Sequence, residues 1–171
     1  EGAVLDMIIM QNEHNMASHS TVMSVDMGKN SLLRLYLVSL HGGVIDNRVT
    51  VNLNGKGGEA SLNGLYFGDG EQRITTEVNL FHNVGECHSN QLFKGFTEPH
   101  LEIYADDVKC SHGATVGRLD ENELFYMRSR GIELNEAILL QQQAFAQAVL
   151  EKISNEQLRG RLMDLVEKRL R

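Results

Sequence analysis

Up to about residue 117, apolar and polar residues alternate along the chain. Leu33, Leu35 and Leu37 occupy every second position of one such run. A period of two is typical of β-strands that bury one face and expose the other. Further runs of this kind cover residues 22–27, 48–53, 74–80 and 101–105. Glycine-rich segments separate the runs, which recur roughly every 10–17 residues, and no helical pattern lies between them.

This alternating region is compatible with a β-sandwich, a jelly roll or a β-helix. The sequence shows no strict coil repeat that would choose among these three folds. Its asparagines would suit a ladder of stacked coils, and they would equally suit ordinary turns. They are Asn52, Asn54, Asn63, Asn79 and Asn83. The pattern therefore predicts a mainly β region and leaves the arrangement of its strands open.

From Asp120 onwards the apolar period is that of amphipathic helices. Asp120 and Glu123 predict a capping pair at the start of a first helix. Gly131 predicts the glycine C-cap of the same helix. A second helix is predicted over residues 135–152.

Ser154 and Gln157 predict the capping box of a third helix, whose apolar stripe runs from Leu158 to Leu170. Three short helices within about 50 residues form a marginal bundle by themselves. We therefore expect these helices to dock on the β region or to hold a partner.

The chain has 171 residues, which suits one domain or a small domain with an appendage. Its net charge of −7 is unevenly placed. Residues 1–119 hold 8 basic and 14 acidic residues, whereas residues 120–171 hold 8 and 9. The acidic first region argues against nucleic acid as a partner, because phosphate binding requires a basic face.

Cys87 and Cys110 are too few for a disulfide framework, so we expect a reducing compartment and place the protein in the cytoplasm. No apolar run approaches the roughly 18 residues of a membrane span, and we expect no membrane partner. The chain begins at Glu1 rather than at a methionine, so we expect a processed chain or a part of a longer one.

Residues 104–112 read Tyr-Ala-Asp-Asp-Val-Lys-Cys-Ser-His, and residues 124–132 read Leu-Phe-Tyr-Met-Arg-Ser-Arg-Gly-Ile. At this distance from each other, the two stretches resemble the SufB/SufD family of iron–sulfur cluster assembly scaffolds, and within it the SufD branch. The resemblance extends to residues 91–95 and, more loosely, to residues 63–66. A SufB chain would carry a different pattern with a Glu-His pair around residues 103–112, so this stretch favours SufD.

The resemblance implies a right-handed parallel β-helix over residues 1–117, followed by a small α-helical subdomain over residues 118–171. In the family, further coils normally precede the stretch that begins near Leu101. Here Phe96 is followed directly by Thr97, and several dozen residues are absent. Either the protein has lost these coils or the natural chain is longer at this point. We favour the longer chain, because losing whole coils would leave unmatched stacking faces.

Cys110 and His112 offer a thiolate and an imidazole, which suit iron or zinc, and residues two apart in a strand share a face. His112 precedes Gly113, at what reads as the exit from a strand into a glycine-bounded turn. Two ligands are too few for a closed zinc or Fe–S site. The resemblance implies that the equivalent residues lie at the contact with SufB. We therefore expect a metal half-site for a transient Fe–S cluster shared with SufB, and no cofactor in the isolated chain.

The other candidate ligands predict no second site. Cys87 reads as a small buried hydrophobic residue. Asp106 and Asp107 would point to opposite faces of a strand, so they do not predict a glycosidase carboxylate pair. The remaining histidines lack metal-ligand spacing; they are His14, His19, His41, His82 and His100. Hydrolase, metalloprotease and ATP-binding motifs are also lacking, so we expect a protein that is not an enzyme.

The leading hypothesis is a non-catalytic scaffold that pairs with a SufB-like subunit near Cys110 and His112. Its terminal helices would dock a SufC-like ATPase, and the chain alone would form a homodimer. One alternative is a β-helix carbohydrate-active enzyme such as a lyase, which would need a groove of acidic and basic side chains. The strands offer only isolated basic residues, Arg34, Arg48 and Arg73. The other alternative is the SufB paralogue itself.

Overall fold

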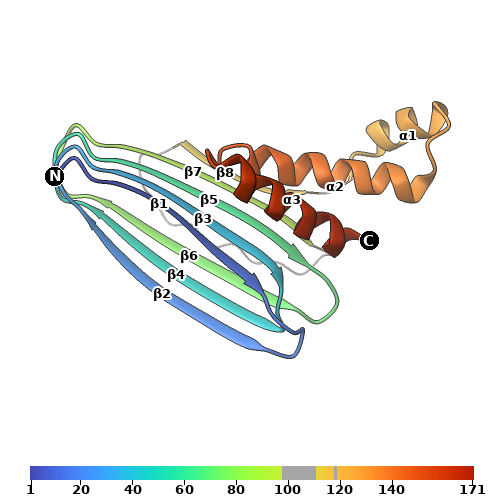
Figure 1. Ribbon diagram of the computed structural model, residues 1–171, viewed down its shortest axis with the longest axis horizontal. Helices are drawn as coiled ribbons and strands as arrows, with labels where there is room; N and C mark the ends of the chain where they lie inside the picture. Colours follow the sequence, from blue (N-terminus) through green and yellow to red (C-terminus); the bar gives the residue numbers. More distant parts are fainter. Residues whose placement is uncertain (98–110, 118) are drawn as a thin grey trace. The chain divides into compact units, whose positions relative to one another are not determined.

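A computed structural model describes residues 1–97, 111–117 and 119–171 of the chain (Figure 1). These residues divide into two compact units, 1–114 and 115–171. The strands are β1 (Val4–Asn12), β2 (Ser18–Met27), β3 (Leu32–His41), β4 (Val44–Leu53), β5 (Glu59–Gly68), β6 (Arg73–His82), β7 (His88–Thr97) and β8 (Ser111–Gly117). The helices are α1 (Glu121–Ser129), α2 (Leu134–Leu150) and α3 (Glu156–Leu170).

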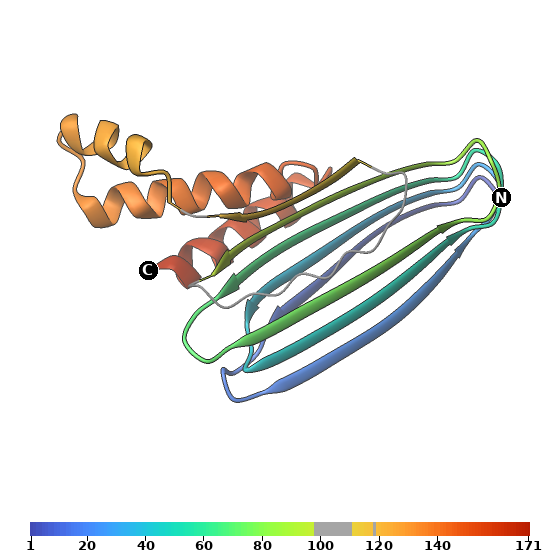
Figure 2. The same ribbon diagram turned by 180° about the vertical axis from the view of Figure 1, so that it is seen from behind.

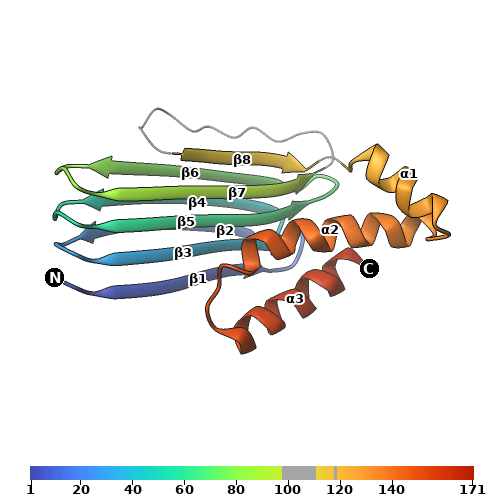
Figure 3. The same ribbon diagram turned by 90° about the horizontal axis from the view of Figure 1, so that it is seen from above.

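From β1 to β7, successive strands alternate between two sheets, and within each sheet these strands run parallel. One sheet has the order β1-β3-β5-β7-β8 and the other the order β2-β4-β6 (Figures 1 and 3). Val4 pairs with Leu32, Leu32 with Glu59, and Glu59 with His88, so each coil takes 27 to 29 residues before it returns to the same sheet. The predicted parallel β-helix is confirmed.

The alternating runs at 22–27, 33–37, 48–53 and 74–80 lie within β2, β3, β4 and β6, as predicted. The run at 101–105 lies outside the described residues. No strict repeat is visible in the sequence because coil length varies by up to two residues, and inward positions share apolarity rather than identity.

The glycine-bounded turn predicted after His112 was wrong. Residues 111–117 form strand β8, which lies beside β7 in the five-stranded sheet. Two glycines in seven residues disfavour a strand locally. Pairing with a neighbouring strand supplies the backbone hydrogen bonds that override this local preference.

The core lies between the two sheets, where inward side chains of successive coils stack in rows. Leu33 and Leu35 of β3 are each 1% exposed, and Val49 and Val51 of β4 are fully buried. The complete apolar cluster is Met27, Leu33, Leu35, Leu37, Val49, Val51, Leu53, Ala60, Leu62 and Leu80. Figure 2 shows the two facing sheets from behind. Inward apolar rows repeated over several coils are what hold a solenoid together.

The turns from the three-stranded sheet back to the five-stranded one also stack. Asn30, Gly57 and Glu86 occupy equivalent positions and all have positive φ, at 54°, 72° and 63°. The Asn30 N–H donates to the Lys56 carbonyl at 2.9 Å, and the Gly57 N–H donates to the Glu86 carbonyl at 3.0 Å. Asparagine and glycine tolerate this conformation best, which explains two of the three residues.

The asparagine ladder is partly confirmed. Asn83 donates to Asn54 of the preceding coil at 2.7 Å, and Asn52 donates to Asp26 at 2.9 Å. Asn63 and Asn79 instead bond to Ser61 and Glu77 within their own strands. Of the five asparagines in the predicted ladder, those near the turns are therefore the ones that link one coil to the next.

Helix α1 has the predicted N-cap and C-cap, but of the predicted capping pair only the Asp120 half forms, because the Asp120 N–H donates to the Gln141 side chain at 3.1 Å. The Asp120 carboxylate accepts hydrogen bonds from the N–H groups of Asn122 and Glu123. Gly131 has φ +87°, and the Ile132 N–H donates to the Met127 carbonyl at 3.2 Å. This is the glycine-terminated cap expected from the sequence.

The predicted capping box of α3 was wrong by one residue. Asn155, not Ser154, is the N-cap, and its side chain accepts from the Leu158 N–H at 3.0 Å. Serine and asparagine are both favourable N-cap residues, so the local sequence did not indicate which of the two would cap the helix. Helices α2 and α3 pack on each other and include buried Val149 and Val166 (Figure 1).

Candidate functional site

The metal half-site predicted from the sequence is only partly covered by the structure. Cys110 lies in the segment 98–110, outside the described residues. The backbone of His112 is the second residue of β8, so it lies at the start of a strand and not at its exit as predicted. Strand β8 is the last strand in the order of the five-stranded sheet, as far as the described residues go. The pairing of Cys110 with His112 stays a prediction.

In the described part of the chain, no three His, Cys, Asp or Glu side chains gather closely enough to hold a metal ion. The His14 Nδ1 accepts from the Met16 N–H at 3.2 Å. His41 pairs with Asn15 at 3.2 Å, and the Nε2 of His82 lies 2.9 Å from the Ser89 hydroxyl. His100 lies outside the described residues.

Cys87 follows the turn before β7 and packs against the apolar cluster, but it is half-buried, so its interpretation as a small buried hydrophobic residue holds only in part. Its Sγ donates to the Gly55 carbonyl of the preceding coil at 3.3 Å. The thiol therefore fills space between two stacked turns.

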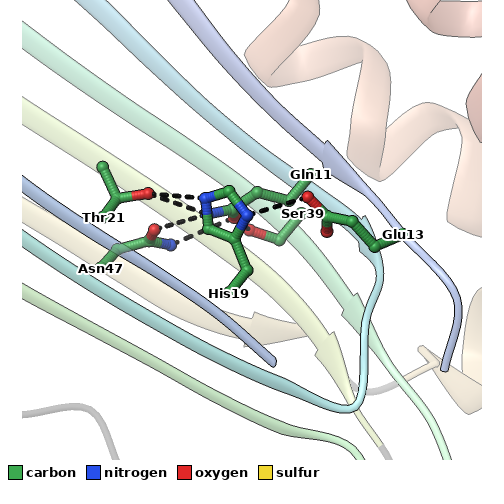
Figure 4. A network of polar contacts seen from close by, with 6 residues as sticks. All are labelled: Gln11, Glu13, His19, Thr21, Ser39 and Asn47. Atoms are coloured by element: carbon green, nitrogen blue, oxygen red, sulfur yellow. Dashed lines mark hydrogen bonds and ion pairs between the residues drawn. The ribbon is translucent and has the colours of Figure 1, made fainter. Parts of the chain in front are cut away.

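A buried polar cluster, which sequence analysis missed, occupies the other end of the solenoid interior (Figure 4). We call Gln11, Glu13, His19, Thr21, Ser39 and Asn47 the lumen polar cluster. Gln11 is its centre and is fully buried. The Gln11 amide donates to the Asn47 carbonyl oxygen at 2.6 Å and accepts from the Ser39 hydroxyl at 2.5 Å. The Gln11 Nε2 also reaches the Thr21 hydroxyl at 3.4 Å.

His19 continues the lumen polar cluster towards solvent. Its Nδ1 lies 2.9 Å from the Glu13 carboxylate, and its Nε2 lies 3.0 Å from the Thr21 hydroxyl (Figure 4). A carboxylate only accepts, so Nδ1 carries a proton, and in the neutral ring Nε2 accepts from Thr21. The chain of groups thus runs from a half-exposed carboxylate to a buried amide pair.

The centre of the lumen polar cluster connects two coils through buried groups, since Gln11 and Asn47 are fully buried and Ser39 is 2% exposed. Gln11 and Thr21 belong to the first coil, and Ser39 and Asn47 to the second. Breaking these hydrogen bonds would leave buried amide groups without partners. The free-energy cost of that loss exceeds the net stability that the bonds themselves contribute. The sequence signal for this cluster is a polar residue at a position that the alternation assigns to the inward face. Asn47 is such a residue, because it lies between the inward positions Ile45 and Val49.

Tyr66 lies next to Ser39 in the same inward row and is 5% exposed. Within the described part of the chain its hydroxyl has no hydrogen-bond partner. Burial raises the pKa of Tyr66 to about 12, because the phenolate would lose its hydration. A Cβ on its sheet neighbour Gly95 would run into the ring, so glycine there makes room for the tyrosine.

The helical unit carries a second feature, an apolar groove between α1 and α2. The groove has a volume of about 560 Å³ and is lined by Asn122, Glu123, Tyr126, Met127, Leu140, Gln141 and Ala144. Tyr126 is 59% exposed and Leu140 41%. The Gln141 side chain donates to the Asp120 carbonyl at 3.0 Å and accepts from its N–H at 3.1 Å, which ties α1 to α2. Exposed apolar side chains in a groove are typical of a surface that binds another protein.

None of the helices in the described residues has the length and apolar character needed to cross a membrane.

A family model described as "SUF system FeS cluster assembly, SufBD core domain" matches residues 1–98 and 96–145. The chain therefore belongs to the SufBD family of the SUF system. It is 32% identical to the iron-sulfur cluster assembly protein SufD of Escherichia coli, in an alignment that covers 77% of this chain and 40% of that protein. The family resemblance, with SufD as the nearer branch, is confirmed.

Other relatives carry the family name. A SufBD family protein of Mycobacterium leprae is 29% identical over 84% of this chain and 49% of its own length. One of Synechocystis is 49% identical over 70 residues, which cover 41% of this chain and 16% of its own length. The chain thus spans about half the length, or less, of the curated relatives it matches.

Proposed function

We propose that this chain is a non-catalytic scaffold segment of the SUF iron–sulfur cluster assembly machinery, working in the cytoplasm with a SufB-like subunit and a SufC-like ATPase. Membership of the SufBD family is the observation that carries the proposal. The β-solenoid followed by three helices supports it, because a solenoid offers stacked edges for partners and the helices offer a separate surface.

The apolar groove between α1 and α2 is the proposed docking surface for the ATPase. Its lining is largely apolar, and Tyr126 in that lining is 59% exposed. Aromatic and aliphatic side chains in a groove are the usual anchors of a protein interface. The match to the family model extends through α1 and most of α2, which supports a role for this part of the chain in the family.

Leu140→Asp tests this docking surface, because it places a charge in the groove at a position that is already 41% exposed. Leu158→Asp is the matched control, since Leu158 is 37% exposed on α3 and does not line the groove. We expect Leu140→Asp to lose co-purification with the SufC-like ATPase and Leu158→Asp to keep it. Equal binding by both variants would refute docking in the groove.

Cys110 and His112 are the proposed half-site at the SufB-like partner. A thiolate and an imidazole suit iron, and a partner would have to supply the remaining ligands. The place of β8 as the last described strand of its sheet supports a partner contact there, since an unpaired strand edge binds other chains readily.

His112→Ala in the reconstituted complex tests the half-site. We expect a melting temperature within a few degrees of the unchanged chain, normal co-purification with both partners, and a strong loss of cluster formation. Zinc or iron bound stoichiometrically to the purified chain alone would contradict a half-site, and so would normal cluster formation by the variant.

We also propose that the natural form of this chain carries further coils between Phe96 and Thr97. Alignments with mycobacterial relatives support this, because they run over 205 positions, more than the 171 residues of the chain. The two matched segments of the family model also meet at residues 96–98. Intact mass measurement of the protein purified from its natural source would decide the question.

A further inference from the structure

The apolar groove between α1 and α2 is bordered by a positively charged side chain. The guanidinium carbon of Arg130 lies 5.1 Å from the centre of the Tyr126 ring, and Tyr126 lines the groove. Guanidinium groups stack readily on aromatic faces, and such a contact favours one position of a long side chain. The charge of Arg130 is therefore held at the edge of the groove before a partner binds.

The helical period explains why Arg130 lies on this side of α1. Residues three and four apart share a face of a helix. Arg130 follows Met127 by three residues and Tyr126 by four, and both of these line the groove. Arg128 comes two residues before Arg130, which is about 200° around the helix, so it lies on the opposite face. Of these two arginines, only Arg130 is placed to meet a segment bound in the groove.

The Arg130 guanidinium has no anionic partner within the described residues. It forms no ion pair there, not even with Glu133, which is three residues along the chain. By contrast, Arg159 and Arg171 on α3 each pair with a glutamate. Arg130 therefore keeps a planar fork of donors, which is the arrangement that binds a carboxylate through two hydrogen bonds.

A negative charge lies further along the same groove. Glu123 is part of the lining, and in the part of the chain that the structure describes its carboxylate forms no ion pair. Glu123 precedes Arg130 by seven residues, which corresponds to about 10 Å along a helix. The groove thus has a negative end and a positive end, with Tyr126 and Met127 between them in the sequence of α1.

We propose that Arg130 and Glu123 select the segment of the ATPase that docks in the groove and fix its direction. That segment carries an apolar side chain for the groove, a carboxylate that meets Arg130, and a basic group that meets Glu123. This inference rests on the proposed docking of the ATPase in the groove, and it adds the chemistry of the segment that docks. Opposite charges across an interface steer the encounter and exclude partners of the wrong charge.

Titration calorimetry with the SufC-like ATPase at several salt concentrations tests the proposal. Arg130→Gln removes the charge and the fork, and should raise the dissociation constant about tenfold at low salt. Arg130→Lys keeps the charge without the fork and should fall between Arg130→Gln and the unchanged chain. Arg128→Gln is the matched control, since Arg128 is an exposed arginine on the opposite face of α1, and it should bind like the unchanged chain. Salt should weaken binding less in Arg130→Gln than in the unchanged chain.

Leu140→Asp distinguishes failure of this inference from failure of docking in the groove. If Leu140→Asp loses binding while Arg130→Gln and Arg128→Gln bind equally well, docking stands and recognition by charge is overturned. If Leu140→Asp binds normally, docking in the groove is refuted and the inference falls with it. A lower melting temperature of unbound Arg130→Gln, with an unchanged dissociation constant, would place the partner carboxylate within the protein itself and would also overturn the inference.

Discussion

The two ends of the solenoid interior are built from different chemistry. Near the turns that lead into β3, β5 and β7, the interior is a continuous apolar cluster around Leu35, Val51 and Leu62. Near the opposite turns, the interior instead holds the lumen polar cluster around Gln11 and Asn47, together with a small apolar cluster of Ile45, Tyr66 and Ile74. Gln11 and Asn47 are as fully buried as Leu35 and Val51, so burial does not distinguish the centres of the two ends.

The difference shows how such a solenoid selects one stacking register. Inward positions recur every second residue, so a slip of two residues would keep apolar side chains facing inward. Hydrophobic contacts are non-directional and would tolerate that slip. The Gln11–Asn47 pair would not, because each buried amide would lose a partner at a defined distance. The apolar end therefore supplies most of the stability, and the polar end specifies the register.

The largest expected effect is at the apolar end. Leu35→Ala removes a side chain that is 1% exposed and leaves a cavity, which should lower the free energy of unfolding by about 2–5 kcal/mol. Urea unfolding measures this change. Val22→Ala is the control, since Val22 is 79% exposed and should shift stability by less than about 0.5 kcal/mol. Similar losses in both variants would contradict a core at this end.

Asn47→Ala should cost about 1–3 kcal/mol, because it leaves the buried Gln11 amide without its partner. Asn79→Ala, which breaks only an exposed bond to Glu77, is the control and should be nearly neutral. The double variant with Gln11→Ala should cost less than the sum of the two single variants. Strict additivity would show that the two amides do not act together.

Tyr66→Phe removes a buried hydroxyl that has no partner in the described structure, and should stabilise the protein by about 1 kcal/mol at neutral pH. The raised pKa also predicts a pH effect. The folded state holds the Tyr66 proton more tightly than the unfolded state, so stability falls as pH rises from about 10 towards 12.

The loss of stability between pH 10 and pH 12 should be smaller in Tyr66→Phe than in the unchanged chain. Urea unfolding at several pH values measures this difference. Tyr126→Phe is the control, because Tyr126 is 59% exposed. An unchanged pH profile in Tyr66→Phe would assign the alkaline loss to other groups.

The smallest effect concerns the stacked turns at the apolar end. Glu86 has φ 63°, so Glu86→Gly should relieve backbone strain. The substitution also removes an exposed ion pair with Lys56, and we expect a net stabilisation of about 0.5 kcal/mol. Gly57→Ala at the equivalent position should have the opposite sign, because its φ is 72° and a Cβ would meet Asn30. Thermal unfolding of both variants measures the two changes in stability. Changes of the same sign would show that φ does not determine the effect of glycine at this position.

The sequence by itself determined the features that depend on neighbouring residues. Alternation predicted several strands, and Asp120 and Gly131 predicted both ends of α1, because a cap is a contact within one turn of chain. The stretches at residues 104–112 and 124–132 identified the family. The half-site at Cys110 and His112 remains a prediction from the first of these stretches.

Only the tertiary structure decided the features that depend on coils meeting across 27 to 29 residues. Strand β8 forms because β7 provides its partner, although its glycines predicted a turn. The lumen polar cluster forms because Gln11 and Asn47 meet across 36 positions of the chain. Such contacts leave no local pattern, since a side chain's surroundings are set by whichever coil lies beside it.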